Sequence, residues 1–146
     1  MNLSYVTEND SERERLRALV TGLSDEEMAH PVGRGWTVGA TLVHLAFWDR
    51  LWLAKFEEWE RTGVVQMPQI GDALDRMNDG MLPWWRTIAP AQVRYETVAA
   101  AEAADSKVAG LPVWAVQAIL AVRPRTLIRA IHRHHHLDRI EQALTH

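Results

Sequence analysis

The sequence predicts an all-α protein, built as a four-helix bundle with additional short helical turns. Apolar residues recur at intervals of three and four along most of the 146 residues, as they do on one face of an α-helix, whereas the strict alternation typical of strands is hard to find. Four long helical segments of this kind bury their apolar stripes by packing together. No internal repeat and no long linker divides the chain, so we expect one domain over residues 1–146.

Two helical segments are expected near the start of the chain. A stripe of leucine and valine predicts a helix over residues 10–23. Ser24 and Glu27 have the spacing of a capping box, so a short helical turn should follow. Residues 31–35 contain one proline and two glycines, and this composition predicts an irregular loop.

The longest helix is expected over residues 38–61. Thr37 has the residue type of an N-cap, and Gly63 follows the last turn, where glycine commonly ends a helix. A further helix is expected over residues 72–88. It contains Pro83, which lacks a backbone donor and should kink the helix or divide it.

Three helical segments complete the pattern. Residues 93–108 are rich in alanine and favour a helix. Residues 113–122 form a continuous apolar decapeptide, which favours a buried short helix over a strand, although periodicity alone does not separate the two. Thr126 is expected to cap the last helix, which should run to Ala143.

Composition excludes several classes of protein. The hydrophobic fraction is 47% and the formal net charge is −3, without a basic block that would indicate nucleic acid or an apolar run long enough for a membrane span. The first residues lack the features of a signal peptide, so a cytoplasmic location is expected. Cysteine is absent, so any metal site must use histidine and carboxylate ligands.

The histidine-rich stretch from residue 132 to 136 carries the clearest functional pattern. Residues four apart lie on the same face of a helix, so His132 and His136 project side by side, on a ridge whose other members are isoleucine and leucine. Burying unpaired imidazoles costs a few kcal/mol, and a divalent ion would satisfy both. The same spacing also occurs by chance. His134 lies on the opposite side and is expected to be exposed, whereas His135 is intermediate.

A third candidate ligand lies far upstream. His44 belongs to the apolar face of the helix over residues 38–61. A lone histidine there is more often a core residue with satisfied hydrogen bonds than a ligand. Bundle sites, however, are built from inward-facing groups on different helices. His44 together with His132 and His136 would give three imidazoles and leave a coordination position open, as in catalytic zinc sites.

Several stretches together resemble the DinB-like superfamily, which includes the N-terminal domains of mycothiol-dependent maleylpyruvate isomerases and the bacillithiol transferases. The first half contributes Leu23-Ser24-Asp25-Glu26-Glu27, Gly35-Trp36-Thr37-Val38 and Leu42-Val43-His44-Leu45-Ala46-Phe47-Trp48-Asp49, and the end contributes the HxxxH stretch from His132 to Ile140. The resemblance implies a four-helix bundle with long crossover connections, often a homodimer. It also implies that His44, His132 and His136 are the metal ligands. Asp138-Arg139 stands where the family commonly has Gly-Gln.

The resemblance further suggests a reaction. Relatives transfer a low-molecular-weight thiol to an electrophile or use it for isomerisation, so a metal-dependent thiol S-transferase is the leading hypothesis, with a small-molecule thiol and an electrophile as substrates. Zinc or nickel is expected first, with iron and manganese as further candidates. A metal-dependent hydrolase and a non-catalytic metal- or ligand-binding stress-response protein remain alternatives. No catalytic residue is assigned.

Two further groups of residues have open roles. Asp49 lies about 140° around the helix from His44, so a salt bridge or cap is favoured over a general base. Trp48, Trp84, Trp85 and Trp114 could wall an apolar pocket over the metal, or could simply be core residues.

Overall fold

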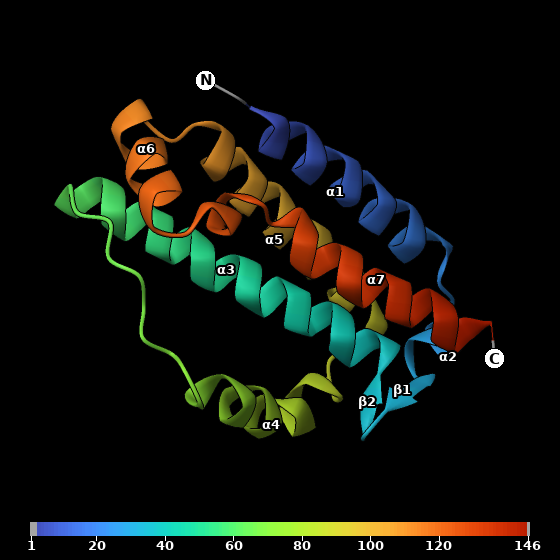
Figure 1. The fold of residues 1–146 in the computed structure, drawn as a ribbon. Helices are drawn as coiled ribbons and strands as arrows, with labels where there is room; N and C mark the ends of the chain where they lie inside the picture. Colours follow the sequence, from blue (N-terminus) through green and yellow to red (C-terminus); the bar gives the residue numbers. More distant parts are fainter. Residues whose placement is uncertain (1–2, 146) are drawn as a thin grey trace.

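Four long helices form the body of the molecule. The computed structural model describes residues 3–145, and the long helices are α1 (Ser4–Gly22), α3 (Val38–Thr62), α5 (Pro90–Ala109) and α7 (Ala130–Leu144) (Figure 1). Helix α5 packs against α1 and α3, and α7 packs against the same two helices from the other side. Helices α1 and α3 therefore occupy opposite corners of the bundle. The all-α prediction is confirmed.

The connections are long, as the resemblance implied. Helices α3 and α5 run in the same direction, so the chain must cross back along the bundle between them, and this crossover contains α4 (Ala73–Trp85) (Figure 1). The connection from α5 to α7 contains α6 (Val113–Val122) and the 3₁₀ turn η1 (Pro124–Leu127). Together these connections place α3 and α7 next to each other.

Local capping signals were read correctly from the sequence. Ser24 begins α2 (Asp25–Met28): its Oγ accepts from the Glu27 backbone N–H at 3.0 Å, and the Glu27 carboxylate accepts from the Ser24 N–H at 2.9 Å. The Thr37 hydroxyl accepts from the Ala40 N–H at 3.1 Å and caps α3. Gly63 ends α3 with a φ of 76°, a left-handed conformation that glycine adopts without strain.

Two segments near the N-terminus differ from prediction. Helix α1 begins at Ser4, six residues before the expected start, because Asn9 is a buried anchor: its side chain donates to the Leu127 carbonyl and accepts from the Ala130 N–H, both at 2.9 Å. A polar anchor leaves no apolar periodicity. The expected loop at 31–35 is instead a hairpin of β1 (Pro31–Gly33) and β2 (Trp36–Thr37), whose turn has positive φ at residues 33–35.

Proline positions account for the remaining differences. Pro83 neither divides nor ends α4, because it lies in the last turn and the helix continues to Trp85, three residues short of the predicted end. Pro90 opens α5 at its first turn, where no amide donor is required. Pro124 starts the turn η1, which contains Thr126, so α7 begins only at Ala130 and Thr126 does not cap it.

The decapeptide over residues 113–122 is helical but not fully buried. Ala115, Val116 and Ile119 face the core, whereas the large apolar residues of the other face are at least 41% exposed: Val113, Trp114, Leu120 and Val122. The expectation of a buried helix was therefore wrong for that face, because α6 lies on the outside of the bundle end, where only one side has a partner. No helix among residues 3–145 combines the length and the apolar character required to cross a bilayer.

Candidate metal centre

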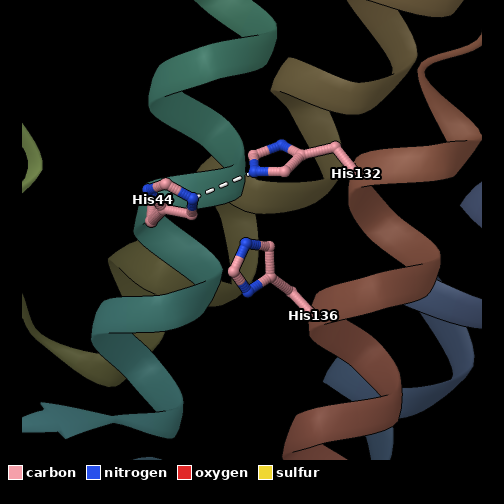
Figure 2. Close-up of side chains that lie close together, drawn as sticks. All are labelled: His44, His132 and His136. Atoms are coloured by element: carbon pink, nitrogen blue, oxygen red, sulfur yellow. Dashed lines mark hydrogen bonds between the residues drawn. The ribbon is translucent and has the colours of Figure 1, made fainter. Parts of the chain in front are cut away.

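Three histidines from two helices meet between α3 and α7. His44 projects from α3, and His132 and His136 project from successive turns of α7 (Figure 2). One potential ligand nitrogen from each ring lies within 4.8 Å of the other two. The residues selected from sequence as a possible three-histidine set are thus brought together, although His44 and His132 are 88 positions apart.

The hydrogen bonding of these rings is incomplete. His44 Nε2 and His132 Nε2 are 3.0 Å apart and share one hydrogen bond. The Nδ1 atoms of His44 and His136 are buried without any hydrogen-bond partner. A histidine retained for core structure would normally have both nitrogens paired. The Nε2 atoms of His44 and His132 face each other, and a cation between the rings would accept their lone pairs in place of the single hydrogen bond (Figure 2).

The spacing of the nitrogens suits a small cation. Metal–nitrogen bonds of about 2.0–2.1 Å in a tetrahedral site separate two imidazole nitrogens by roughly 3.4 Å. The distances within the cluster run from 3.0 Å up to 4.8 Å and bracket that separation. The donor set is compatible with binding a divalent ion.

Burial keeps all three imidazoles neutral. Burial lowers the pKa of His44 to about 4, and the neighbouring Asn78 side chain offsets part of this decrease. Burial lowers the pKa of His136 to about 3, with added repulsion from His44. Burial also lowers the pKa of His132, and repulsion from His44, His136 and Arg129 adds to the effect. At neutral pH each ring thus has the uncharged form that a metal ligand requires.

Aromatic rings surround His44. The ring centroids of Trp36, Trp85 and Trp48 lie 5.4, 5.7 and 6.5 Å from that of His44, with steep interplanar angles. Of the tryptophans expected at the pocket, Trp48 and Trp85 are therefore beside the site. Trp84 and Trp114 are 61% and 42% exposed and do not line the site's cleft; each lies on the outer face of a short helix.

A buried ion-pair network fixes α7 against the other helices. The Arg133 side chain on α7 donates to Asp105 at 2.7 and 2.8 Å and to Asp49 at 3.3 Å. Asp49 also accepts from Arg129 Nε at 3.0 Å, and Asp105 accepts from Arg13 at 2.7 Å. Asp49 thus forms the expected salt bridge. Sequence reasoning missed Arg133, which lies between two histidines yet is buried in ion pairs with Asp49 on α3 and Asp105 on α5.

The other two histidines of the run have different surroundings. His134 is exposed, as predicted, and its Nδ1 lies 3.0 Å from a Glu12 carboxylate oxygen. His135 is exposed as well, and its ring centroid is 4.9 Å from that of His136. Neither belongs to the three-histidine cluster.

The three histidines line a large open cleft. Its volume is about 1320 Å³, above the usual 300–1,000 Å³ of small-molecule pockets. The cleft extends from the β1–β2 hairpin past the histidines to η1, with α4 on its other side. Five of its lining residues are arginines, which the sequence reasoning did not select. Arg123 and Arg125 flank Pro124 in the connection before α7, and this short basic motif was the available signal.

Comparisons with known proteins give one match. The family model described as DinB superfamily matches residues 8–140. No curated protein and no solved structure matches the chain.

Proposed function

The chain belongs to the DinB superfamily, and from its converging imidazoles we propose that His44, His132 and His136 hold one divalent metal ion in a metal-dependent thiol S-transferase. The observation that supports the metal assignment is the set of three neutral rings from two helices, each with one nitrogen within 4.8 Å of the others. Imidazole ligands suit zinc, nickel and iron, and manganese is a further candidate.

The ligand set leaves room for chemistry. Three neutral rings contribute no negative charge, and the cluster contains no carboxylate among residues 3–145. A bound divalent ion would lower the pKa of a thiol that reaches it and so supply a nucleophile near neutral pH. The open cleft beside the histidines gives such a thiol and its electrophile access and space.

The chain's own residues would position the reactants. Trp36, Trp48 and Trp85 pack around His44 and shield one side of the site from water. In the transfer a carbon–sulfur bond forms as the bond from carbon to the leaving group breaks, and the thiol proton is released with that group. The chain has no cysteine, so the attacking sulfur comes from the added thiol.

Cobalt substitution provides the test. Cobalt(II) bound to the protein should develop a charge-transfer band when a small thiol such as 2-mercaptoethanol is added, and the band should saturate with thiol concentration. Because the chain has no cysteine, a cobalt–thiolate band can come only from the added thiol. The band should be absent in His44→Ala, and turnover of a haloarene or epoxide should accompany it in the native-metal protein.

Two results would redirect the proposal. Hydrolysis of simple esters or amides without thiol coordination would favour a metal-dependent hydrolase. Stoichiometric metal without either reaction would favour a binding protein.

A further inference from the structure

The cleft beside the three histidines is rich in uncompensated positive charge. Its lining includes five arginines and two acidic residues, Asp75 and Asp79. The arginines are Arg34, Arg123, Arg125, Arg129 and Arg139. The protein as a whole has a formal net charge of −3, so the positive charge of the cleft is opposite in sign to that of the whole protein.

Most of these arginines lack a counter-ion. Within residues 3–145, Arg129 is the one member that forms an ion pair, through Nε to Asp49 at 3.0 Å, and its buried Nη2 has no hydrogen-bond partner. Arg129 is buried, whereas the other four arginines are exposed, and leaving a buried guanidinium nitrogen unpaired is costly. The unpaired Nη2 of Arg129, with the guanidinium groups of Arg123 and Arg125 lining the same cleft, therefore points to an anion that enters the cleft.

Two of the arginines are held against the same aromatic ring. The guanidinium carbons of Arg123 and Arg129 lie 5.8 and 5.9 Å from the centroid of Trp52, a distance typical of cation–π contacts. Burial lowers the pKa of Arg123, and repulsion from Arg125 and Arg129 adds to this effect. Two positive groups thus lie over Trp52, and Arg125 is close enough to Arg123 to repel it.

This arginine group adjoins the histidine cluster. Arg129 is the residue that precedes α7, and His132 follows it by three positions, so both side chains belong to neighbouring positions on one face. Both also line the same cleft. A molecule held by the arginines can therefore extend toward the three imidazoles.

We propose that Arg123, Arg125 and Arg129 form a subsite for an oxyanion, a carboxylate or phosphate group, on the small molecule that reacts at the three-histidine site. Guanidinium forks bind carboxylate and phosphate oxygens through paired charge-assisted hydrogen bonds. The subsite thereby selects anionic substrates over neutral or cationic ones and fixes their orientation. This assignment of substrate class rests on the proposed function, but the anion site itself does not need the metal.

The first experiment uses thiols that differ in charge. The cobalt-substituted protein is titrated with 3-mercaptopropionate, 2-mercaptoethanol and cysteamine, and the dissociation constant of each is read from the charge-transfer band. Arg123→Gln and Arg125→Gln should each raise the dissociation constant of 3-mercaptopropionate by about tenfold or more, as expected for the loss of one charged hydrogen bond. The same variants should keep the dissociation constant of 2-mercaptoethanol within about twofold of the wild-type value. Comparing variant with wild type for each thiol cancels differences in thiol acidity.

A matched control comes from α4. Arg76 is exposed and lies outside the cleft. Arg76→Gln therefore removes the same charge from the molecule and should leave the dissociation constants of all three thiols unchanged. Equal weakening of the anionic and neutral thiols by Arg123→Gln, or an equal effect of Arg76→Gln, would overturn the subsite.

The second experiment separates this inference from the proposed function. Metal-free protein is titrated calorimetrically with succinate and with inorganic phosphate, which identifies the preferred oxyanion. Binding that Arg123→Gln weakens and Arg76→Gln does not would support the subsite even if no thiol coordinates cobalt. Failure of both anions to bind, together with charge-independent thiol binding, would refute it.

Discussion

The three imidazoles differ from ordinary core histidines in what they lack. Two of their buried Nδ1 atoms have no partner, and one hydrogen bond joins His44 to His132. Unsatisfied polar atoms destabilise a fold unless something else compensates. All three line an open cleft, which supports a role in binding.

Removal of any one ligand should abolish stoichiometric metal binding. We expect His44→Ala, His132→Ala and His136→Ala to be purified with far less metal than wild type, because two imidazoles hold a divalent ion much more weakly than three. His134→Ala is the control, since His134 is on the same helix but exposed and outside the cluster. Elemental analysis after metal loading measures the content, and full metal in the His132 variant would contradict the assignment.

Sequence alone identified these histidines better than it identified their neighbours. The spacing of four between His132 and His136 is a local property, so it could be read directly. His44 needed the added premise of a bundle. The roles of Arg123 and Arg125 depend on how the connection before α7 lies over Trp52, and no local pattern encodes that contact.

At the scale of the helices, a buried network determines how α7 sits. Asp105 on α5 accepts from Arg13 on α1 and from Arg133 on α7, so one carboxylate joins three helices. Both Asp105 and Arg133 are almost fully buried. Arg133 also donates to Asp49 on α3, so the network fixes α7 against α3 as well as α5 and holds His132 and His136 beside His44.

Loss of this carboxylate should be strongly destabilising. Asp105→Ala would leave Arg133 buried with fewer partners, and breaking a buried ion pair in this way costs about 3–5 kcal/mol of unfolding free energy. Asp10→Ala is the matched control, since Asp10 also pairs with Arg13 but is 55% exposed, and exposed pairs contribute about 0–1 kcal/mol. Urea denaturation of the metal-free proteins measures both. Similar losses for the two variants would show that the network contributes little.

The limits of prediction at this scale have a common cause. Helix boundaries set by local chemistry, such as the caps at Ser24 and Thr37, were correct. The boundaries that failed depend on distant contacts: Asn9 is anchored to residues near 130, and the outer face of α6 is exposed because no element covers it. Periodicity reports which face is apolar, but it does not report whether a neighbour exists.

For the molecule as a whole, burial of the histidines links stability to pH. The pKa values of His44 and His136 are lowered to about 4 and about 3 in the folded chain, whereas unfolded histidine titrates near 6.5. The unfolded state therefore takes up more protons between about pH 6.5 and 4. Stability must fall as the pH falls through this range.

Acid should accordingly weaken the metal-free protein. For His44 alone, the shift corresponds to about 3 kcal/mol of unfolding free energy lost between neutral pH and pH 4. Replacement by a residue that does not titrate, His44→Phe, should make the dependence between pH 6.5 and 4.5 shallower, with His132 and His136 supplying the remainder, whereas exposed His134→Gln should retain the full slope. Unfolding free energies measured at several pH values decide this, and an unchanged slope in the His44 variant would rule the linkage out.

The span between His44 and His132 has a further consequence. The two rings are 88 residues apart in sequence, and the chain has no cysteine with which to form a covalent bridge. An ion held by both would join α3 to α7 in the folded chain. Because an unfolded chain does not hold these histidines together, the ion stabilises the folded state by mass action, by about 4 kcal/mol at a free concentration of 1,000 times its dissociation constant. The proposed centre would thus be a reversible cross-link between two helices, so that removal of the ion by a chelator would lower the stability of the whole bundle as well as empty the site.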